Sequence, residues 1–143
     1  MAAALEQARL GLAAGEVPIG AVAVVGGEIV ARAFNQPIGS SDPTAHAEVL
    51  VLRAAAQQAG NYRLGDASVY VTVEPCLMCV GALLQSDVEA LVYALPNAED
   101  GAAGTVLQLA QHPALARRLR VVSGIRRDEA EELFATAGAG VSG

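Results

Sequence analysis

Two short stretches of the chain carry side chains that could do chemistry together. The first is His46-Ala47-Glu48, and the second, thirty residues later, is Glu74-Pro75-Cys76-Leu77-Met78-Cys79. Their one imidazole and two thiols are the ligand types that a borderline-soft ion such as zinc prefers. The carboxylate of Glu48 stands beside them and need not bind metal.

The number of candidate ligands favours an open metal site. The chain has no further cysteine, and its only other histidine, His112, lies in a distant segment without the short spacing to His46 seen in zinc fingers. Three protein ligands, with the fourth position left to water, is the arrangement of catalytic zinc. Glu48 follows His46 by two residues, which turns it toward the bound water, where it could carry protons. We therefore interpret Glu48 as catalytic and His46, Cys76 and Cys79 as ligands of one zinc ion.

Each motif alone has a plainer interpretation. A Cys-x-x-Cys pair can be a redox centre or half of a structural zinc site, and an isolated His-Ala-Glu is weaker evidence still. Glu74 is explained by its place at a strand end, so we assign it a structural task. The two motifs in combination, each near an expected helix start, favour the catalytic zinc site.

The first motif is expected at the start of a buried helix. Asp42-Pro43 is typical of a helix N-terminus, because Asp accepts free amides and Pro is tolerated in the first turn. His46 and Glu48 would then lie in that first turn. Residues 45–59 are apolar almost all round, which favours burial, and Gly60 ends the helix.

The second motif is expected where a strand gives way to a helix. Residues 68–73 are typical of a strand, and Glu74-Pro75 interrupts it. The following helix would begin at Cys76. Since Cys76 and Cys79 are three residues apart, they would share one face of its first turn.

The rest of the chain alternates strands with helices. The pattern predicts helices at 2–14, 105–111 and 126–137, and strands at 19–25, 28–34, 89–94 and 118–122, with a Gly26-Gly27 hairpin turn. Such alternation implies a three-layer α/β domain with one sheet. We expect one domain over residues 1–143, with a frayed tail at 138–143.

Composition argues against a membrane protein. No apolar run approaches the roughly 18 to 20 residues that span a bilayer, and the Ala-rich N-terminus carries Glu6 and no basic leader. The two cysteines are too close in sequence to cross-link a secreted fold. We therefore expect a protein of the reducing cytoplasm with no membrane contact.

The charge of the chain gives a mixed indication about nucleic acid. Nine basic residues against fifteen acidic ones give a net charge of −6, which works against long-range attraction of a polyanion. All nine basic residues are arginines, however, and five of them crowd into residues 117–127. A local basic patch is therefore compatible with the acidic average.

Several stretches beyond the ligands resemble one enzyme family. The pattern His-x-Glu followed by Pro-Cys-x-x-Cys is the signature of zinc nucleobase deaminases. From about residue 5 to residue 134 the chain is similar to the bacterial tRNA-specific adenosine deaminases. The matching stretches are Glu16-Val17-Pro18-Ile19-Gly20-Ala21-Val22, Asn35-Gln36-Pro37-Ile38-Gly39, Asp42-Pro43-Thr44-Ala45-His46-Ala47-Glu48, Asn61-Tyr62-Arg63-Leu64 and Val73-Glu74-Pro75-Cys76-Leu77-Met78-Cys79-Val80-Gly81-Ala82.

This resemblance implies a fold and a reaction. The fold would be the three-layer α/β/α cytidine deaminase-like fold, with one central mixed five-stranded sheet. The protein would be a homodimer with one zinc ion per subunit, acting on a tRNA anticodon stem-loop. There the wobble adenosine would be hydrolysed to inosine with release of ammonia, and Glu48 would carry protons from the water to the ring and to the departing amine.

The resemblance also implies substrate contacts. Asn35 would hydrogen-bond the flipped-out base, Val17 would wall its pocket, and the backbone of Ala47 and Cys76 would orient the base and the water. An ordinary turn asparagine and a buried core valine are the plainer interpretations of Asn35 and Val17. His112 would touch the nucleic acid, with loop capping as the alternative.

The chain departs from the family pattern in two places. After the fourth strand the family has Ala-Arg-Asp followed by a basic residue, whereas this chain has Leu95-Pro96-Asn97-Ala98-Glu99-Asp100. Asn97 would face the substrate in place of the Asp and, being less negative, would relax the preference for RNA. Its alternative is a plain polar loop residue. The family's aromatic and arginine-rich C-terminal helix is also replaced here by residues 131–138, which lack a basic tail.

Two other functions remain open at this point. A deaminase of a free purine base or nucleoside, such as a guanine deaminase, would share the zinc core and would suit an acidic surface better. A non-catalytic, zinc-stabilised partner subunit is a different class of protein. The intact Glu48 speaks against it.

Overall fold

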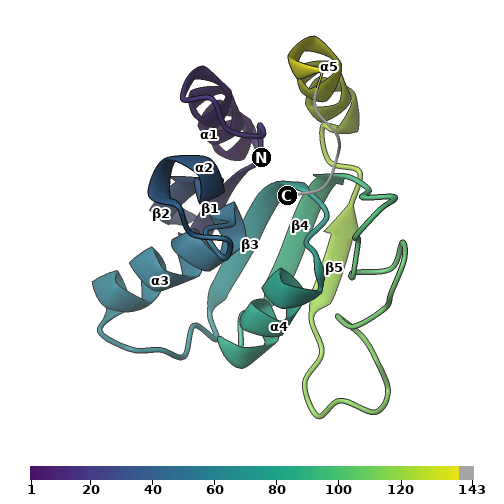
Figure 1. Cartoon of the computed structure of the whole chain (residues 1–143). Helices are drawn as coiled ribbons and strands as arrows, with labels where there is room; N and C mark the ends of the chain where they lie inside the picture. The colour runs from purple at the N-terminus through teal and green to yellow at the C-terminus, as the bar shows by residue number, and fades with distance from the viewer. Residues whose placement is uncertain (139–143) are drawn as a thin grey trace.

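Five strands form one mixed sheet in the middle layer of the fold (Figure 1). The structure is a computed structural model, and it describes residues 1–138. β1 pairs antiparallel with both β2 and β3, whereas β3, β4 and β5 are parallel to one another. The strands are β1 (Gly20–Val25), β2 (Glu28–Phe34), β3 (Ala67–Val73), β4 (Ala90–Leu95) and β5 (Arg120–Ser123), in the spatial order β2-β1-β3-β4-β5.

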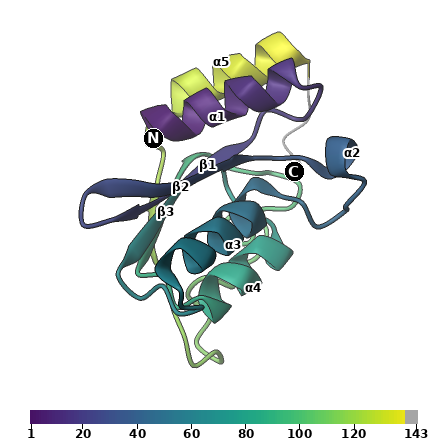
Figure 2. The same ribbon diagram turned by 90° about the vertical axis from the view of Figure 1, so that its left-hand side faces the viewer.

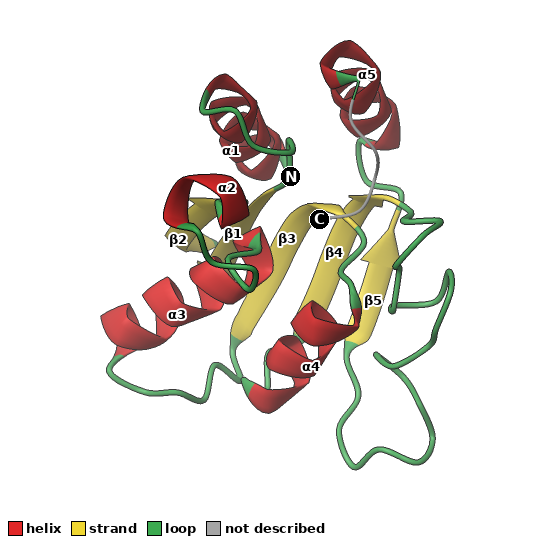
Figure 3. Ribbon diagram, in the orientation of Figure 1, coloured by secondary structure: helices red, strands yellow, loops and turns green. Residues whose placement is uncertain are grey.

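Helices cover both faces of this sheet. α1 (Ala2–Ala13) and α5 (Arg127–Ala137) lie together on one face, and α3 (Ala47–Ala59) and α4 (Leu77–Gln85) lie on the other (Figure 2). A long irregular segment connects β4 to β5 (Figure 3). The predicted three-layer α/β/α architecture with a central mixed sheet is confirmed.

Small and branched apolar residues fill the space between the layers. β4 is buried along its whole length, as expected for a parallel strand covered on both faces. Val51, Leu83 and Leu91 have no exposed surface. Each such side chain stabilises the fold by about 1.5–3 kcal/mol relative to leaving it in water. The core therefore gives the elements around the candidate site a fixed frame.

One edge of the sheet gathers the segments that carry the candidate site. Because β3, β4 and β5 are parallel, their carboxyl ends lie at the same edge. β1 runs antiparallel to β3, so the start of β1 and the end of β2 lie at this edge too, and Gly20 N donates to Thr72 Oγ1 at 3.1 Å. Strand topology thus brings Asn35, the turn at Cys76 and the segment after β4 together.

Most element boundaries follow the sequence prediction. Gly26 and Gly27 have φ of 57° and 80°, the left-handed conformation that a two-residue hairpin turn requires between β1 and β2. The ends of the predicted strands and of the long helices agree with the structure to within two residues. Local sequence patterns were therefore sufficient for the regular elements.

The start of α3 differs from the prediction. Asp42 does not begin the helix, because its Oδ1 accepts hydrogen bonds from Thr44 N at 2.9 Å and from Thr44 Oγ1 at 2.8 Å and so closes a local turn. α3 begins at Ala47, with His46 as its N-cap. Glu48 lies in the first turn as predicted, but His46 lies just before it. Between β2 and α3 the chain also forms one helical turn, α2 (Pro37–Ser40).

The predicted helix at 105–111 is wrong. This segment forms turns, with an isolated bridge between Ala103 and Gln108. The amides of Val106 and Leu107 both donate to the carbonyl of Gly101, at 2.9 and 3.0 Å, which folds the segment back onto the preceding loop. Tertiary contacts have overridden a weak helical pattern.

Two further expectations concern membrane-spanning helices and the C-terminal tail. No helix among residues 1–138 is both long enough and apolar enough to cross a bilayer. The predicted frayed tail lies, from residue 139 onward, outside the described residues.

Candidate functional site

Two helix N-termini meet at the sheet edge, and a candidate metal ligand caps each of them. His46 is the N-cap of α3 and Cys76 is the N-cap of α4, both with extended backbone at φ −74°. Neither side chain makes a capping hydrogen bond to its own helix. Their donor atoms therefore remain available to a metal ion, in the positive partial charge of two helix ends.

The donor atoms of His46, Cys76 and Cys79 fit a tetrahedral zinc ion. His46 Nδ1 lies 3.6 Å from Cys76 Sγ and 3.4 Å from Cys79 Sγ. All three ligand atoms lie within 4.8 Å of one another. Zinc bonds of ordinary length at tetrahedral angles separate a nitrogen from a sulfur by about 3.6 Å. The predicted ligands are thus brought together at the spacing that zinc requires, and no further residue among 1–138 joins this donor group.

The pKa values of the two thiols are shifted in opposite directions. Hydrogen bonds, first with Cys79 and then with His46, together lower the pKa of Cys76 to about 4 against the opposing effect of partial burial. The same thiol–thiol hydrogen bond, together with burial, raises the pKa of Cys79. The hydrogen bond with Cys76 raises the pKa of His46. A cation that binds here must therefore displace protons.

Zinc affinity is expected to fall as the pH is lowered from roughly 8 to 6, by about tenfold per unit for each proton displaced. The ligands bind metal only when deprotonated, and the raised pKa values of Cys79 and His46 keep protons on them as the pH falls. Competition with a coloured chelator at several pH values measures this slope. An affinity that stays constant over the range would contradict the assigned ligands.

Glu48 lies beside the donor cluster without belonging to it. Its side chain is only 4% exposed, and burial raises its pKa to about 7. Its carboxyl group is close enough to Cys79 to form a hydrogen bond with the thiol. A carboxyl group with a pKa near neutrality can both accept and release a proton at physiological pH.

Asn35 and Ala47 are joined directly. Asn35 Oδ1 accepts a hydrogen bond from Ala47 N, the first amide of α3, at 2.7 Å. Asn35 is fully buried, and its Nδ2 has no hydrogen-bond partner among the described residues. A buried amide donor without a partner costs about 1–3 kcal/mol. A bound ligand that accepts a hydrogen bond from Nδ2 would explain this arrangement. The Ala47 amide, in contrast, already donates to Asn35 Oδ1.

A cavity of about 420 Å³ opens beside the metal ligands. One wall is formed by Pro43, His46 and residues 76–78, and the opposite wall comes from the segment after β4. That second wall carries two acidic residues, Glu99 and Asp100, and two exposed aliphatic residues, Val106 and Leu107. The cavity is large enough for a nucleobase and has an acidic rim.

The described residues that line this cavity include none of the five predicted contact residues, Val17, Asn35, Ala47, Asn97 and His112. Asn97 is buried, and its Oδ1 accepts the amides of Glu99 at 3.1 Å and Asp100 at 3.0 Å, so it shapes the loop. His112 Nδ1 accepts the amide of Ala114 at 3.1 Å, which is the loop-capping alternative. Val17 is half-buried and packs against the core. Their contacts with substrate stay predictions.

The arginine-rich segment does not form one patch. Arg117 lies before β5, at the edge opposite the metal ligands, and pairs with Asp87 at 3.0 Å. Arg126 and Arg127 follow β5 and so lie at the site's own edge, with half-exposed side chains whose nearest carboxylates are 3.8 and 3.9 Å away. The second pair shares the carboxyl edge of the sheet with the metal ligands, but it begins α5, which packs on the opposite face.

Sequence reasoning missed or underrated two buried carboxylates at the site. Glu16 accepts the amides of Ile38 at 3.1 Å and Gly39 at 2.6 Å, and so fixes the segment that follows Asn35. Glu74 accepts several amides from the loop after β4. The only available signal was an acidic residue inside an otherwise apolar stretch.

Comparison with known proteins finds similarity over most of the chain. A family model described as the cytidine and deoxycytidylate deaminase zinc-binding region matches residues 1–95. The tRNA-specific adenosine deaminase of Bacillus subtilis (strain 168) is 42% identical over 129 residues, which are 90% of this chain and 80% of that relative.

Solved structures of both tRNA deaminases and guanine deaminases resemble this chain. One from a study of A-to-I editing by tRNA:A34 deaminases at the wobble position of transfer RNA has a TM-score of 0.90 and 37% identity, covering 93% of this chain and 96% of that one. The guanine deaminase of Bacillus subtilis has a TM-score of 0.66 and 32% identity, covering 98% and 92%. The first structure is the better match on both measures.

Proposed function

The chain belongs to the cytidine and deoxycytidylate deaminase family, among the tRNA-specific adenosine deaminases, and we propose that it hydrolyses the wobble adenosine of a tRNA anticodon to inosine and ammonia. The observation that carries the chemistry is the group of three donors, His46, Cys76 and Cys79, at zinc spacing with the buried carboxyl group of Glu48 beside it. Three protein donors leave one position of a tetrahedral zinc ion for water.

The zinc ligands, Glu48 and Asn35 would each have a separate role in the reaction. His46, Cys76 and Cys79 would hold one zinc ion per subunit, which would supply a water of lowered pKa for attack on carbon 6 of adenine. Glu48 would carry the first proton of that water to the ring nitrogen beside carbon 6, and then the second proton, from the new hydroxyl on carbon 6, to the departing amine, which leaves as ammonia. The free Nδ2 of Asn35 donates to the flipped-out base.

A free purine is the competing substrate, and one experiment separates the two. The purified protein is incubated with an anticodon stem-loop that carries adenosine at the wobble position, and separately with guanine and adenosine. We expect inosine and ammonia from the stem-loop and little from the free purines. Ammonia from guanine alone would replace this function by that of a guanine deaminase.

Asn35→Asp tests the base contact. The carboxylate keeps the acceptor that Ala47 N needs but cannot donate to the base. Losing a hydrogen bond in a buried site costs about 1–3 kcal/mol, so kcat/KM for the stem-loop is expected to fall by roughly 10- to 100-fold. Zinc content and the unfolding temperature are measured alongside. Parent-level kcat/KM with normal zinc would remove Asn35 from the substrate contacts.

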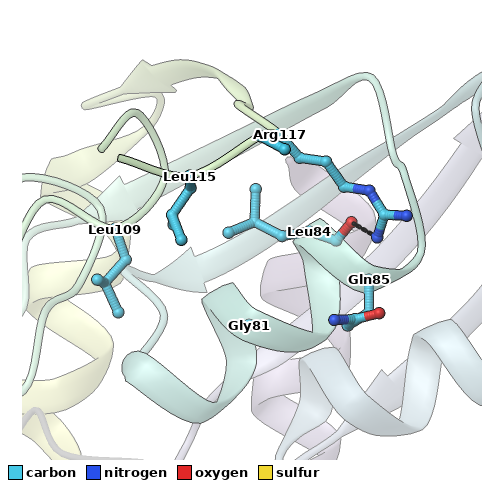
Figure 4. A pocket seen from close by; sticks show the side chains of 7 residues that line it. Gly81, Leu84, Gln85, Leu109, Leu115 and Arg117 are labelled. Atoms are coloured by element: carbon cyan, nitrogen blue, oxygen red, sulfur yellow. Dashed lines mark hydrogen bonds between the residues drawn. The ribbon is translucent and has the colours of Figure 1, made fainter. Parts of the chain in front are cut away.

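We also propose that the protein is a homodimer through the outer face of α4. α4 contains no charged residue, and beside it lies a cavity of about 570 Å³ lined by Leu84, Leu109 and Leu115. Figure 4 shows these side chains converging, with Arg117 at the rim donating to Leu84 O at 3.3 Å. An apolar hollow on an uncharged helix is typical of an association surface.

Leu115→Glu is expected to weaken the dimer at least about 100-fold, because each of the two copies would bury an unpaired charge. Sedimentation velocity over a concentration series measures the change. Leu10→Glu is the matched control, since Leu10 is an exposed leucine of α1 on the opposite face of the sheet. A parent protein that is monomeric, or a Leu115→Glu variant that dimerises as the parent does, would remove this interface.

The partner and the compartment follow from the same proposal. Arg126 and Arg127 lie at the edge of the sheet that holds the zinc ligands, where they could contact anticodon phosphates. Glu99 and Asp100 on the cavity rim oppose that attraction. We place the protein in the cytoplasm, where tRNA is abundant and where a reducing environment keeps the two free cysteines as metal ligands.

A further inference from the structure

Glu74 is a buried carboxylate that the proposed chemistry does not use. Its side chain is 1% exposed, and it lies between the end of β3 and the zinc ligand Cys76. It does not belong to the three-donor group, and no ion pair among residues 1–138 includes it. An isolated buried carboxylate is costly unless hydrogen bonds satisfy its oxygens.

The loop after β4 satisfies those oxygens. Glu74 Oε1 accepts Asn97 N at 3.2 Å, and Glu74 Oε2 accepts Ala103 N at 3.0 Å and Thr105 N at 3.1 Å. The hydroxyl of Thr105 also donates to Oε1. One carboxylate therefore holds both the beginning and the end of the loop, across 23 to 31 positions of sequence.

Gly101 shows how closely the loop passes over this carboxylate. A Cβ atom on Gly101 would lie 2.6 Å from the Glu74 carboxyl carbon and 2.5 Å from Asn97 O. Both distances are too short for real atoms, so only glycine fits. The carbonyl of Gly101 in turn accepts the amides of Val106 and Leu107. Through Gly101, Glu74 therefore also fixes the position of Val106 and Leu107, which line the cavity.

The held loop supplies one whole wall of the substrate cavity. Glu99, Asp100, Val106 and Leu107 all come from this segment and face the wall that contains the metal ligands. The zinc ligands and Glu48 belong to α3 and α4 or cap their N-termini. The loop touches this segment through a backbone hydrogen bond from Ala102 N to Pro75 O at 2.9 Å. Zinc content must therefore be measured to separate an effect on loop position from an effect on the metal site.

We propose that Glu74 is a positioning residue, whose carboxylate holds the 97–107 loop in the conformation that binds the substrate. The proposal rests on the proposed deamination for its kinetic readout. Glu74 acts through the loop and touches neither the reacting atoms nor the metal.

A merely structural role for Glu74 makes a different kinetic prediction. If its loss only destabilised the fold, the fraction of active protein would fall, which lowers the apparent kcat and leaves KM unchanged. If it holds the cavity wall, the intact zinc centre keeps kcat near its parent value and KM rises. The split between kcat and KM therefore distinguishes the two.

The test uses Glu74→Gln. Glutamine has the same size as glutamate, but its side-chain NH₂ would face the backbone N–H groups of the loop, which need an acceptor. Thr105→Val is the milder second variant, because it removes one donor and leaves the carboxylate. Glu28→Gln, an exposed residue at the start of β2, controls for the lost charge. Hydrogen–deuterium exchange of the 97–107 amides, zinc content, and kcat and KM for the stem-loop are measured for each.

For Glu74→Gln the proposal predicts loop amides that exchange at least about tenfold faster than in the parent, with β4 amides and zinc content unchanged. KM should rise by about 10- to 100-fold, and by less for Thr105→Val. Unchanged loop exchange, or a fall in kcat at constant KM, overturns the proposal. If Glu74→Gln does not fold, Thr105→Val decides it by the same measurements. Loop exchange needs no substrate, so it still tests the role of Glu74 if the stem-loop proves not to be the substrate.

Discussion

Replacing Glu48 by Ala is expected to lower the rate of inosine formation by about 10²- to 10⁴-fold, the usual contribution of a general acid–base group. The carboxyl group lies buried beside the donor cluster, and its pKa of about 7 suits it to take a proton from water and return it within one turnover. Single-turnover conversion of the anticodon stem-loop measures the rate directly, without interference from product release.

Two controls give this experiment its meaning. The zinc content of the variant must equal that of the parent, since Glu48 does not belong to the donor group. Glu48→Gln should be as impaired as Glu48→Ala, because an amide of the same shape cannot carry the proton. A Glu48→Ala variant that deaminates as fast as the parent with a full complement of zinc would show the assigned proton carrier to be wrong.

Replacing Cys79 by Ala is expected to abolish both zinc retention and activity. Cys79 is fully buried in the first turn of α4, and its Sγ lies 3.4 Å from His46 Nδ1. Two remaining donors cannot complete a tetrahedral site, so we expect zinc affinity to fall by at least about 10³-fold. Metal analysis after gel filtration and equilibrium titration with zinc both report the loss.

Chelation of the parent protein provides the matched comparison. Removal of zinc should inactivate the parent, and adding zinc back should restore it, whereas Cys79→Ala should not recover at the same zinc concentration. Because zinc binds the folded state, the unfolding temperature of the parent should also rise with added zinc. Activity that survives complete removal of the metal would contradict the assignment of the three ligands.

The chemistry of the site was predictable because residue type and local spacing carry it. His46, Cys76 and Cys79 are the only ligands of their kinds apart from His112, and Glu48 follows at a fixed distance along the chain. The hairpin turn was predictable for a similar local reason, since adjacent glycines at 26 and 27 suit positive φ. Such features need no knowledge of the rest of the fold.

Features that depend on contacts between distant segments were not predictable. Asp42 could equally begin a helix or close a turn with Thr44, and the structure shows the turn. The 105–111 segment has a weak helical pattern, but Glu74, from another part of the chain, takes the amide of Thr105. A sequence does not show which distant partner will accept an amide.

Surface charge was the other property that required the topology. Arg117 and Arg126 are close in sequence, yet β5 separates them and places them at opposite edges of the sheet. Asn97 is predicted to face the substrate, and that contact stays a prediction; what the structure adds is that its Oδ1 accepts the amides of Glu99 and Asp100. Both outcomes follow from where strands begin and end.

The measurement that tests the central claim most directly is mass spectrometry of an anticodon stem-loop after incubation with the zinc-loaded protein in ¹⁸O-labelled water. Hydrolytic deamination puts one oxygen from water on carbon 6 of the wobble base, so we expect inosine at that position carrying one ¹⁸O atom, and one ammonia per inosine. A stem-loop that is recovered unchanged, while guanine in the same water is hydrolysed to ¹⁸O-labelled xanthine, would contradict the proposed function.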